Sequence, residues 1–299
     1  MSSSLNTSQE KAGKIAARVL KEMEKEIVPG KKLISLCTQA EKKIIEYGAR
    51  PAFPCNISID HVAAHYTSPV GDKSTIPDSG LVKVDLGAQV DGYLSDVART
   101  FDIDGTLEGF VAATDDALNE ALSMMMPGTK VGDIGNTIER VIKAYGLKPI
   151  SNLTGHNMKR WVLHAGKNIP NVKTRGPEVI EVGEVYAVEP YATNGAGTVI
   201  DTDLVYIYAN TGRDVPLEGT QAKLRDHLHK KYGPLPFSAR WIGTASKDVD
   251  LFDEIRGLLK AKTIIGIPVK ASRKGRPVSQ SEHTVYISET DPVILTKFD

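Results

Sequence analysis

The sequence predicts an α/β fold made of two related halves, with a helical insertion ahead of the last strands. Three observations support this prediction: an internal repeat, the same order of helices and strands in both copies, and a helix-rich stretch after Glu189. The chain has 299 residues, enough for one large domain or two small ones, and 41% of them are hydrophobic. That fraction is sufficient for a sizeable core.

The internal repeat aligns residues 28–51 with residues 126–149 after a shift of 98 positions (127 − 29). Chance would supply one or two identities in a single register. The observed identities are Pro29 with Pro127, Gly30 with Gly128, Lys32 with Lys130, Glu41 with Glu139, Ile44 with Ile142, Tyr47 with Tyr145, Gly48 with Gly146, and Pro51 with Pro149. We interpret the copies as similar parts of one pseudo-twofold domain, with a site where they meet.

Each copy is predicted to contain a helix, a Pro-Gly turn, a second helix and then strands. The first helix should span about Ser8 to Ile27, and its counterpart about Leu107 to Met126. Apolar residues of the first helix recur at helical spacing, namely Ile15, Val19, Leu20 and Met23. The second helices should end at Gly48 and Gly146, because a glycine followed shortly by a proline is a helix stop signal.

We predict a single catalytic domain over residues 1–299, with halves at about 8–100 and at 107–204 plus 266–299. Residues 205–265 are predicted to form a helical insertion subdomain. Within it, amphipathic helices are expected over Thr220–Tyr232 and Lys247–Lys262. Strand-like sequence then returns at Ser281–Ile287.

Composition argues against several classes of protein. Lys and Arg number 37, as do Asp and Glu, so there is no net charge to favour nucleic acid or an anionic membrane. No apolar run approaches the roughly 20 residues of a membrane helix, and the N-terminus lacks the pattern of a signal peptide. The only cysteines, Cys37 and Cys55, are interpreted as reduced thiols. We therefore expect a cytoplasmic protein without nucleic-acid or membrane partners.

Residues 82–101 have the pattern of a β-hairpin that turns at Asp91-Gly92, a strong two-residue turn signal. With that turn, Asp96 lies opposite Gly87, two residues from Asp85 on the neighbouring strand, so the two carboxylates share a face. Aspartate is disfavoured in strands. The pair is either part of a solvated face or the two sides of a cation site, where an ion removes the like-charge repulsion.

Three other residues are candidates on chemistry alone. His156 is expected on a loop marked by a glycine, within Thr154–Asn157. Glu189 is expected near the end of a strand over Glu184–Tyr191, and Glu282 on a strand that starts at Ser281. A single glutamate in a strand is more often exposed than a ligand. Spacing does not by itself connect these residues with the aspartates.

From Pro51 onwards, and more loosely before it, the chain resembles the type II methionine aminopeptidases of archaea and eukaryotes. The matching stretches are Ala52–Ile59, Ala63–Tyr66, Val84–Gly87, Asn152–His156, Leu163–Gly166, Tyr186–Pro190 and Glu282–Thr284. The resemblance implies the pita-bread fold, whose pseudo-twofold symmetry agrees with the repeat. A long charged N-terminal extension is missing, which favours the archaeal form.

The resemblance implies that Asp85, Asp96, His156, Glu189 and Glu282 hold two divalent metal ions. Four carboxylates and one imidazole suit Mn²⁺, Fe²⁺ or Co²⁺, and Zn²⁺ stays open. In the implied mechanism Asp96 and Glu282 bridge the ions, and an activated water attacks the peptide bond. Glu189 is then the implied proton acceptor.

The same resemblance assigns two histidines. His164 is expected to donate to the substrate carbonyl oxygen, and His65 to contact the scissile amide nitrogen. The repeat shift carries position 65 to within one residue of His164, so the two histidines are expected to face the site from opposite halves. Phe53 and Tyr191 are implied walls of a methionine pocket. Pro236 and Ile267 are expected either nearby or in the ordinary core.

The predicted function is removal of the initiator methionine from nascent proteins with a small second residue. Relatives often have Phe in place of Tyr191 and Tyr in place of Ile267, which leaves the pocket shape open. Two alternatives also stay open. One is an Xaa-Pro peptidase of the same fold, although such enzymes usually have a separate N-terminal domain. The other is a non-catalytic binding protein, although such proteins typically lack ligands. We expect a monomer, in transient contact with the ribosome.

Overall fold

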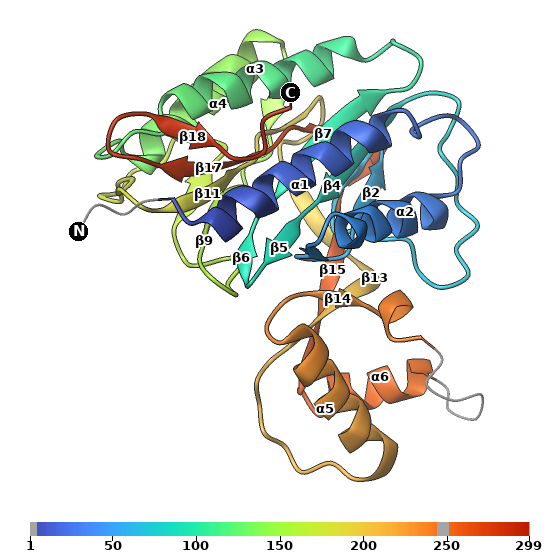
Figure 1. Cartoon of the computed structure of the whole chain (residues 1–299). Coiled ribbons are helices and arrows are strands. Elements are labelled where there is room, and N and C mark those ends of the chain that lie inside the picture. Colours follow the sequence, from blue (N-terminus) through green and yellow to red (C-terminus); the bar gives the residue numbers. More distant parts are fainter. Residues whose placement is uncertain (1–4, 244–250, 299) are drawn as a thin grey trace.

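A computed structural model describes residues 5–243 and 251–298 (Figure 1). The larger body contains α1–α4 and most strands, and a smaller lobe with α5 and α6 extends from it on two long strands, β13 and β15. The elements are α1 Thr7–Glu24, α2 Leu33–Glu46, β1 Arg50–Pro51, β2 Asn56–Ile59, β3 Val62–Ala64, β4 Leu81–Leu86, β5 Ala88–Val90, β6 Tyr93–Leu94, β7 Val97–Asp102, α3 Glu108–Ser123, α4 Val131–Ala144, β8 Lys148–Pro149, β9 Thr154–Met158, β10 Asn168–Pro170, β11 Val185–Val188, β12 Tyr191–Thr193, β13 Val199–Asn210, α5 Gly219–Tyr232, β14 Phe237–Ser238, the 3₁₀ turn η1 Ala239–Trp241, α6 Leu251–Lys260, β15 Ile264–Ser272, the 3₁₀ turn η2 Arg273–Gly275, β16 Val278–Gln280, β17 His283–Ile287 and β18 Pro292–Ile294.

The internal repeat is visible in the elements themselves. The repeat shift carries the bounds of α2 onto those of α4, and those of β1 onto those of β8. Gly48 and Gly146 follow the two helices with φ angles of 82° and 73°, a left-handed conformation that suits glycine at a helix end. The strands repeat too, since β2-β4-β7 corresponds to β9-β11-β17, and β1-β5-β6 to β8-β12-β16. The predicted pseudo-twofold organisation is therefore confirmed.

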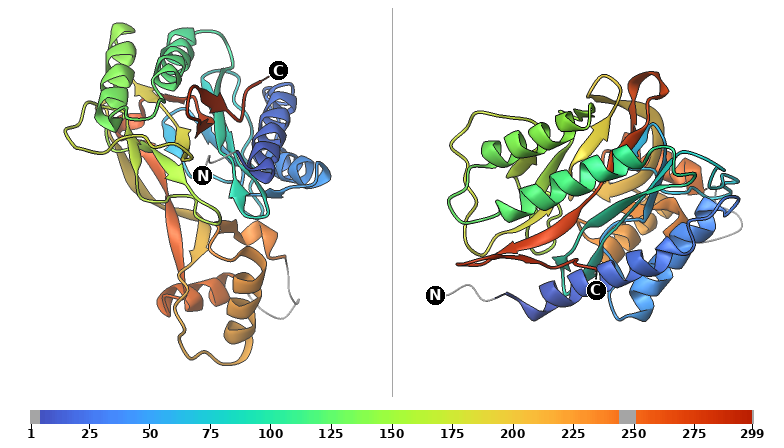
Figure 2. Two further views of the ribbon diagram at one scale, coloured as in Figure 1. Left: turned by 60° about the vertical axis from the view of Figure 1, so that its left-hand side comes forward. Right: turned by 90° about the horizontal axis from the view of Figure 1, so that it is seen from above.

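Each half has its own hydrophobic core under its helix pair. Leu20, Leu36 and Val84 belong to the first core, which joins α1 and α2 to β4. Ile138 and Val285 belong to the second, which joins α3 and α4 to β11 and β17. Figure 2 shows both helix pairs on one side of the strands. The opposite side of the strands is left free to carry polar side chains.

The first helix of each copy is shorter than predicted. α1 ends at Glu24 and α3 at Ser123, three residues before the predicted ends, because turns lead each helix into its Pro-Gly corner. Both second helices end two residues before the predicted glycine, which lies just beyond the helix. These differences do not change the order of elements.

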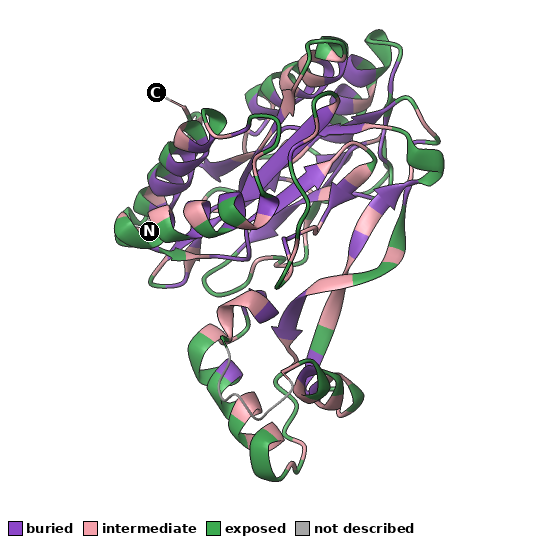
Figure 3. Cartoon of the chain, turned by 90° about the vertical axis from the view of Figure 1, so that its right-hand side faces the viewer, coloured by how far each residue is buried: buried purple, intermediate pink, exposed green. Residues whose placement is uncertain are grey.

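The segment between β13 and β15 is the predicted helical insertion, with α5, β14, η1 and α6 around a small core that includes Phe237 and Leu258. Figure 3 shows how few of its residues are buried compared with the body. Its second helix is described from Leu251, and the predicted start at Lys247 lies outside the described residues. α5 buries only Leu228 completely, so it is less amphipathic than predicted. Boundaries at 205 and 265 stay a prediction.

A partly buried ion pair links the insertion to the first half. Arg240, in η1, donates two hydrogen bonds to Glu41 of α2 at 2.5 and 2.9 Å. Trp241 Nε1 donates to the same carboxylate at 2.8 Å. Because a guanidinium binds a carboxylate in a fixed bidentate geometry, this contact orients the insertion. Among the described helices, none is long and apolar enough to cross a membrane.

Candidate metal centre

The hairpin that carries the two aspartates has the predicted register. Asp85 on β4 lies opposite Ala98 on β7, so Asp96 comes opposite Gly87, as the turn predicts. Asp91 and Gly92 have φ angles of 52° and 84°, the positive values that a tight hairpin turn requires. Trp161 packs against Gly92 so closely that any Cβ there would collide with its ring. Asp85 and Asp96 are both buried.

His156 lies on a strand, which corrects the predicted loop. It belongs to β9, opposite Ala187 of β11. The glycine of this segment, Gly155, does not mark a loop: its role is close packing, because a Cβ there would collide with the carbonyl oxygen of Ala187. β9 therefore lies against its neighbour and directs His156 into the interior.

Glu189 and Glu282 lie between strands, which corrects two predicted continuous strands. β11 ends at Val188, and after Pro190, which has no N–H to donate, the chain enters a different sheet as β12. Glu282 likewise lies between β16 and β17 of different sheets, and its backbone pairs with Ala98. Asp96 occupies the same kind of position between β6 and β7. Three of the carboxylates thus lie where the chain changes sheets.

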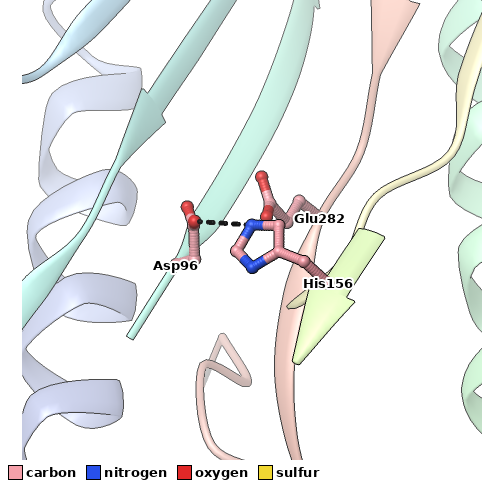
Figure 4. Close-up of side chains that lie close together, drawn as sticks. All are labelled: Asp96, His156 and Glu282. Atoms are coloured by element: carbon pink, nitrogen blue, oxygen red, sulfur yellow. Dashed lines mark ion pairs between the residues drawn. The ribbon is translucent and has the colours of Figure 1, made fainter. Parts of the chain in front are cut away.

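The side chains of Asp96, His156 and Glu282 converge (Figure 4), and one ligand atom from each lies within 4.8 Å of the others. His156 Nε2 is 3.7 Å from Asp96 Oδ2 and 3.8 Å from Glu189 Oε1. These distances are too long for hydrogen bonds and leave space between the atoms. Asp85 lines the same cavity. The five sequence-predicted ligands are therefore brought together by strands from both halves.

Without a cation, it costs free energy to keep the buried carboxylates of this cluster ionised. Burial raises the pKa of Asp85 to about 6 and that of Glu189 to about 8. Burial, with neighbouring carboxylates, raises the pKa of Asp96 and Glu282 well above the ordinary range. Burial and nearby His164 lower the pKa of His156 to about 3, so its imidazole is neutral and able to bind a metal. Four adjacent carboxylates cannot all ionise unaided.

The donor set fits divalent metal ions. Asp85 Oδ1, Asp96 Oδ1 and Glu282 Oε1 are buried and accept no hydrogen bond from any described residue. Buried oxygen atoms without partners are unusual in proteins and call for an explanation. Bound cations would offset the charge of the ionised carboxylates, and an oxygen-rich site with one imidazole suits divalent metal ions.

Two amide side chains support the carboxylates and were not identified from sequence. Asn56 Nδ2 donates to Asp85 Oδ2 at 3.4 Å, and Gln280 Nε2 donates to Glu282 Oε2 at 3.2 Å. Both amides are buried. Asn56 lies in one of the motif stretches quoted above, which is the signal that could have identified it, whereas Gln280 lies in none.

The two predicted histidines line the same cavity. His65 Nδ1 is 3.2 Å from the carbonyl oxygen of Pro268. Because a carbonyl oxygen only accepts, Nδ1 carries the hydrogen of the neutral ring and Nε2 is left as an acceptor. Burial lowers the pKa of His65 to about 4 and also lowers the pKa of His164. The His164 ring lies 4.0 Å from that of His156, centroid to centroid.

The cavity has a volume of about 110 Å³ and an apolar side. Its apolar walls are Phe53, Ala64, Leu163, Tyr191, Ile207, Pro236 and Ile267. They include the two implied walls, Phe53 and Tyr191, and also Pro236 and Ile267, whose place the sequence left open. Tyr191 also opposes the rise that burial causes in the pKa of Glu189. Tyr191 is therefore more than an apolar wall. The cavity joins the cluster of carboxylates and imidazole to an apolar slot.

Residues 8–221 match the model of metallopeptidase family M24, and the chain belongs to that family. The sequence is also similar to methionine aminopeptidases of archaea. It is 41% identical to that of Methanothermobacter thermautotrophicus over 96% of this chain and 97% of the relative. It is 43% identical to that of Methanocaldococcus jannaschii over 96% of each chain. The resemblance that the motifs indicated is therefore confirmed.

Solved structures confirm the pita-bread fold. A thermophilic Arx1 superposes with a TM-score of 0.83 at 23% identity, covering 98% of this chain and 91% of that one. The methionine aminopeptidase of Thermotoga maritima gives 0.72 at 23% identity, covering 99% of this chain and all of the other. The prolidase of Pyrococcus furiosus gives 0.62 at 20% identity, and only 63% of its length is covered.

Proposed function

We propose that this chain removes the N-terminal methionine of newly made proteins, with two divalent metal ions held by Asp85, Asp96, His156, Glu189 and Glu282. The observation that carries the proposal is one cavity in which these five residues meet His65, His164 and an apolar slot. The identity of about 40% with archaeal methionine aminopeptidases over nearly the whole chain supports the same activity.

Bound ions would polarise the scissile carbonyl and lower the pKa of water toward neutrality. The protein's own residues supply the rest. Glu189 lines the cavity and, once ionised beside bound cations, is suited to accept a proton from water and return it to the leaving amine. His164 lines the cavity with a neutral ring that can donate one hydrogen bond to an oxyanion. His65 offers an unprotonated Nε2 that can accept from an amide N–H.

Substrate selection in this proposal depends on the apolar slot. Phe53 and Pro236 lie on it, together with the Ile267 side chain, and these surfaces suit a flexible thioether. The cavity is small, about 110 Å³, which favours one side chain and no more. Because the cavity has room for one side chain only, we propose that the substrate residue after the methionine is small. The cytoplasmic location, monomeric state and transient ribosome contact remain proposals.

Peptide specificity tests the proposal. Apoprotein refilled with Co²⁺, Mn²⁺, Fe²⁺ or Zn²⁺ is expected to cleave Met-Gly-Met, whereas the apoprotein is expected to be inactive. Turnover should be measured in parallel on Ala-Pro and Met-Pro. Cleavage limited to Xaa-Pro bonds would favour an Xaa-Pro peptidase. Failure of every metal to restore activity, with no tight divalent site by calorimetry, would favour a non-catalytic binding protein.

A further inference from the structure

The two halves meet through a short antiparallel ladder beside the cluster of ligands. Ala98 of the first half and Glu282 of the second form its central pair, with backbone N···O distances of 3.0 and 3.4 Å. Two residues further along, the next hydrogen-bonding pair of this register is Asp96 with Thr284 on one side and Thr100 with Gln280 on the other. In an ordinary ladder, backbone groups would bond at these positions as well.

At both flanking positions a threonine hydroxyl replaces the backbone bonds. Thr284 Oγ1 accepts from Asp96 N and donates to Asp96 O, each at 2.7 Å. Thr100 Oγ1 donates to Gln280 O at 2.6 Å and accepts from Gln280 N at 2.8 Å. Each half thus contributes one threonine that binds the backbone of the other half. We call Thr100, Thr284 and the Ala98–Glu282 pair the seam.

The backbone of Thr284 is engaged elsewhere, which explains why its side chain takes this role. Its N–H donates to Thr296 Oγ1 at 2.9 Å, and its carbonyl accepts from Leu295 N at 2.8 Å. Asp96 lies outside any strand, between β6 and β7. Within the described residues, Asp96 therefore lacks backbone hydrogen bonds to a neighbouring strand. The Thr284 hydroxyl bonds both the N–H and the carbonyl oxygen of Asp96 instead. Thr284 is fully buried, so water cannot substitute for it.

We propose that Thr284, assisted by Thr100, is a positioning residue that fixes Asp96 relative to Glu282, so that both carboxylates reach the same pair of metal ions. This role rests on the proposed function, in which Asp96 from the first half and Glu282 from the second bind the same metal ions. Thr100 acts less directly, through Gln280, whose side chain donates to Glu282 Oε2. Removal of either hydroxyl should loosen the spacing of the carboxylates.

Cobalt binding by full-length variants tests the seam. Thr284→Val keeps the side-chain shape and removes both bonds, and we expect it to weaken Co²⁺ binding about 10–100-fold in calorimetry, as is usual when a residue that orients a ligand is lost. Its cobalt absorption spectrum should change as well. Thr284→Ser keeps the hydroxyl and should bind Co²⁺ nearly as the wild type does. Thr100→Val should weaken binding in the same direction by a smaller factor.

Thr193→Val is the matched control. Thr193 is fully buried, and its hydroxyl also donates one bond, to Pro277 O at 2.7 Å, and accepts one, from Gly195 N at 3.1 Å. A purely structural role would make Thr284→Val and Thr193→Val alike in cobalt affinity, and that result would overturn the proposal. If Thr284→Val did not fold, wild-type affinity in Thr100→Val would overturn it. A wild-type protein without cobalt binding would refute the proposed function as well.

Discussion

Replacing His156 with alanine is expected to lower turnover of Met-Gly-Met by about 10³-fold or more in cobalt-refilled protein. A metal acting as Lewis acid contributes several kcal/mol to catalysis, and each 1.36 kcal/mol corresponds to about a factor of ten. His156 is the only nitrogen ligand proposed, and its Nε2 lies between Asp96 and Glu189. Its loss should remove or displace an ion.

Circular dichroism should show that His156→Ala keeps the fold, because β9 is held by its pairing with β10 and β11 and not by the imidazole. His227→Ala, a histidine variant on α5 in the insertion, is the control and should retain activity. Full activity in His156→Ala, with wild-type metal content, would refute the assignment of the site.

The second large effect is expected for Glu189→Gln. Glutamine keeps the shape and one oxygen ligand but cannot accept a proton at neutral pH, so kcat should fall by about 10²–10⁴-fold, the usual contribution of a general base. KM should change little, because the pocket walls are untouched. Metal content, measured by atomic absorption, separates this loss from a loss of ions.

Glu184→Gln is a suitable control for that variant. Glu184 directly precedes β11, the same strand that Glu189 follows, but it pairs with Lys167 at 2.8 Å, away from the cavity. This variant should keep its kcat. A Glu189→Gln protein with a raised KM and an unchanged kcat would show that Glu189 binds substrate and does not transfer the proton.

The parts of this molecule that short-range rules govern could be predicted from sequence. The Asp91-Gly92 turn fixed the register of its hairpin, so the position of Asp96 opposite Gly87 followed from local geometry. The repeat predicted both helix pairs, because the same two residues, a tyrosine and a glycine, follow α2 and α4. Family motifs then predicted the ligands that no local rule connects.

Features that depend on contacts between distant strands could not be predicted. Gly155 resembles a turn residue, and only the carbonyl of Ala187 shows that it permits close packing. The breaks at Glu189 and Glu282 arise because the chain passes from one sheet to another there. Thr284 and Asp96 are 188 residues apart in sequence. No pattern around either residue therefore indicates that the Thr284 side chain contacts the Asp96 backbone.

Anomalous diffraction from crystals grown with Co²⁺ would test the central claim most directly. The proposed site predicts two cobalt peaks in the cavity, roughly 3.5–4 Å apart, as in other two-metal centres. Asp85 should contact one ion, His156 the other, and Asp96 and Glu282 both. A single ion held by Asp96, His156 and Glu282 alone, or cobalt bound outside the cavity, would contradict the dinuclear site.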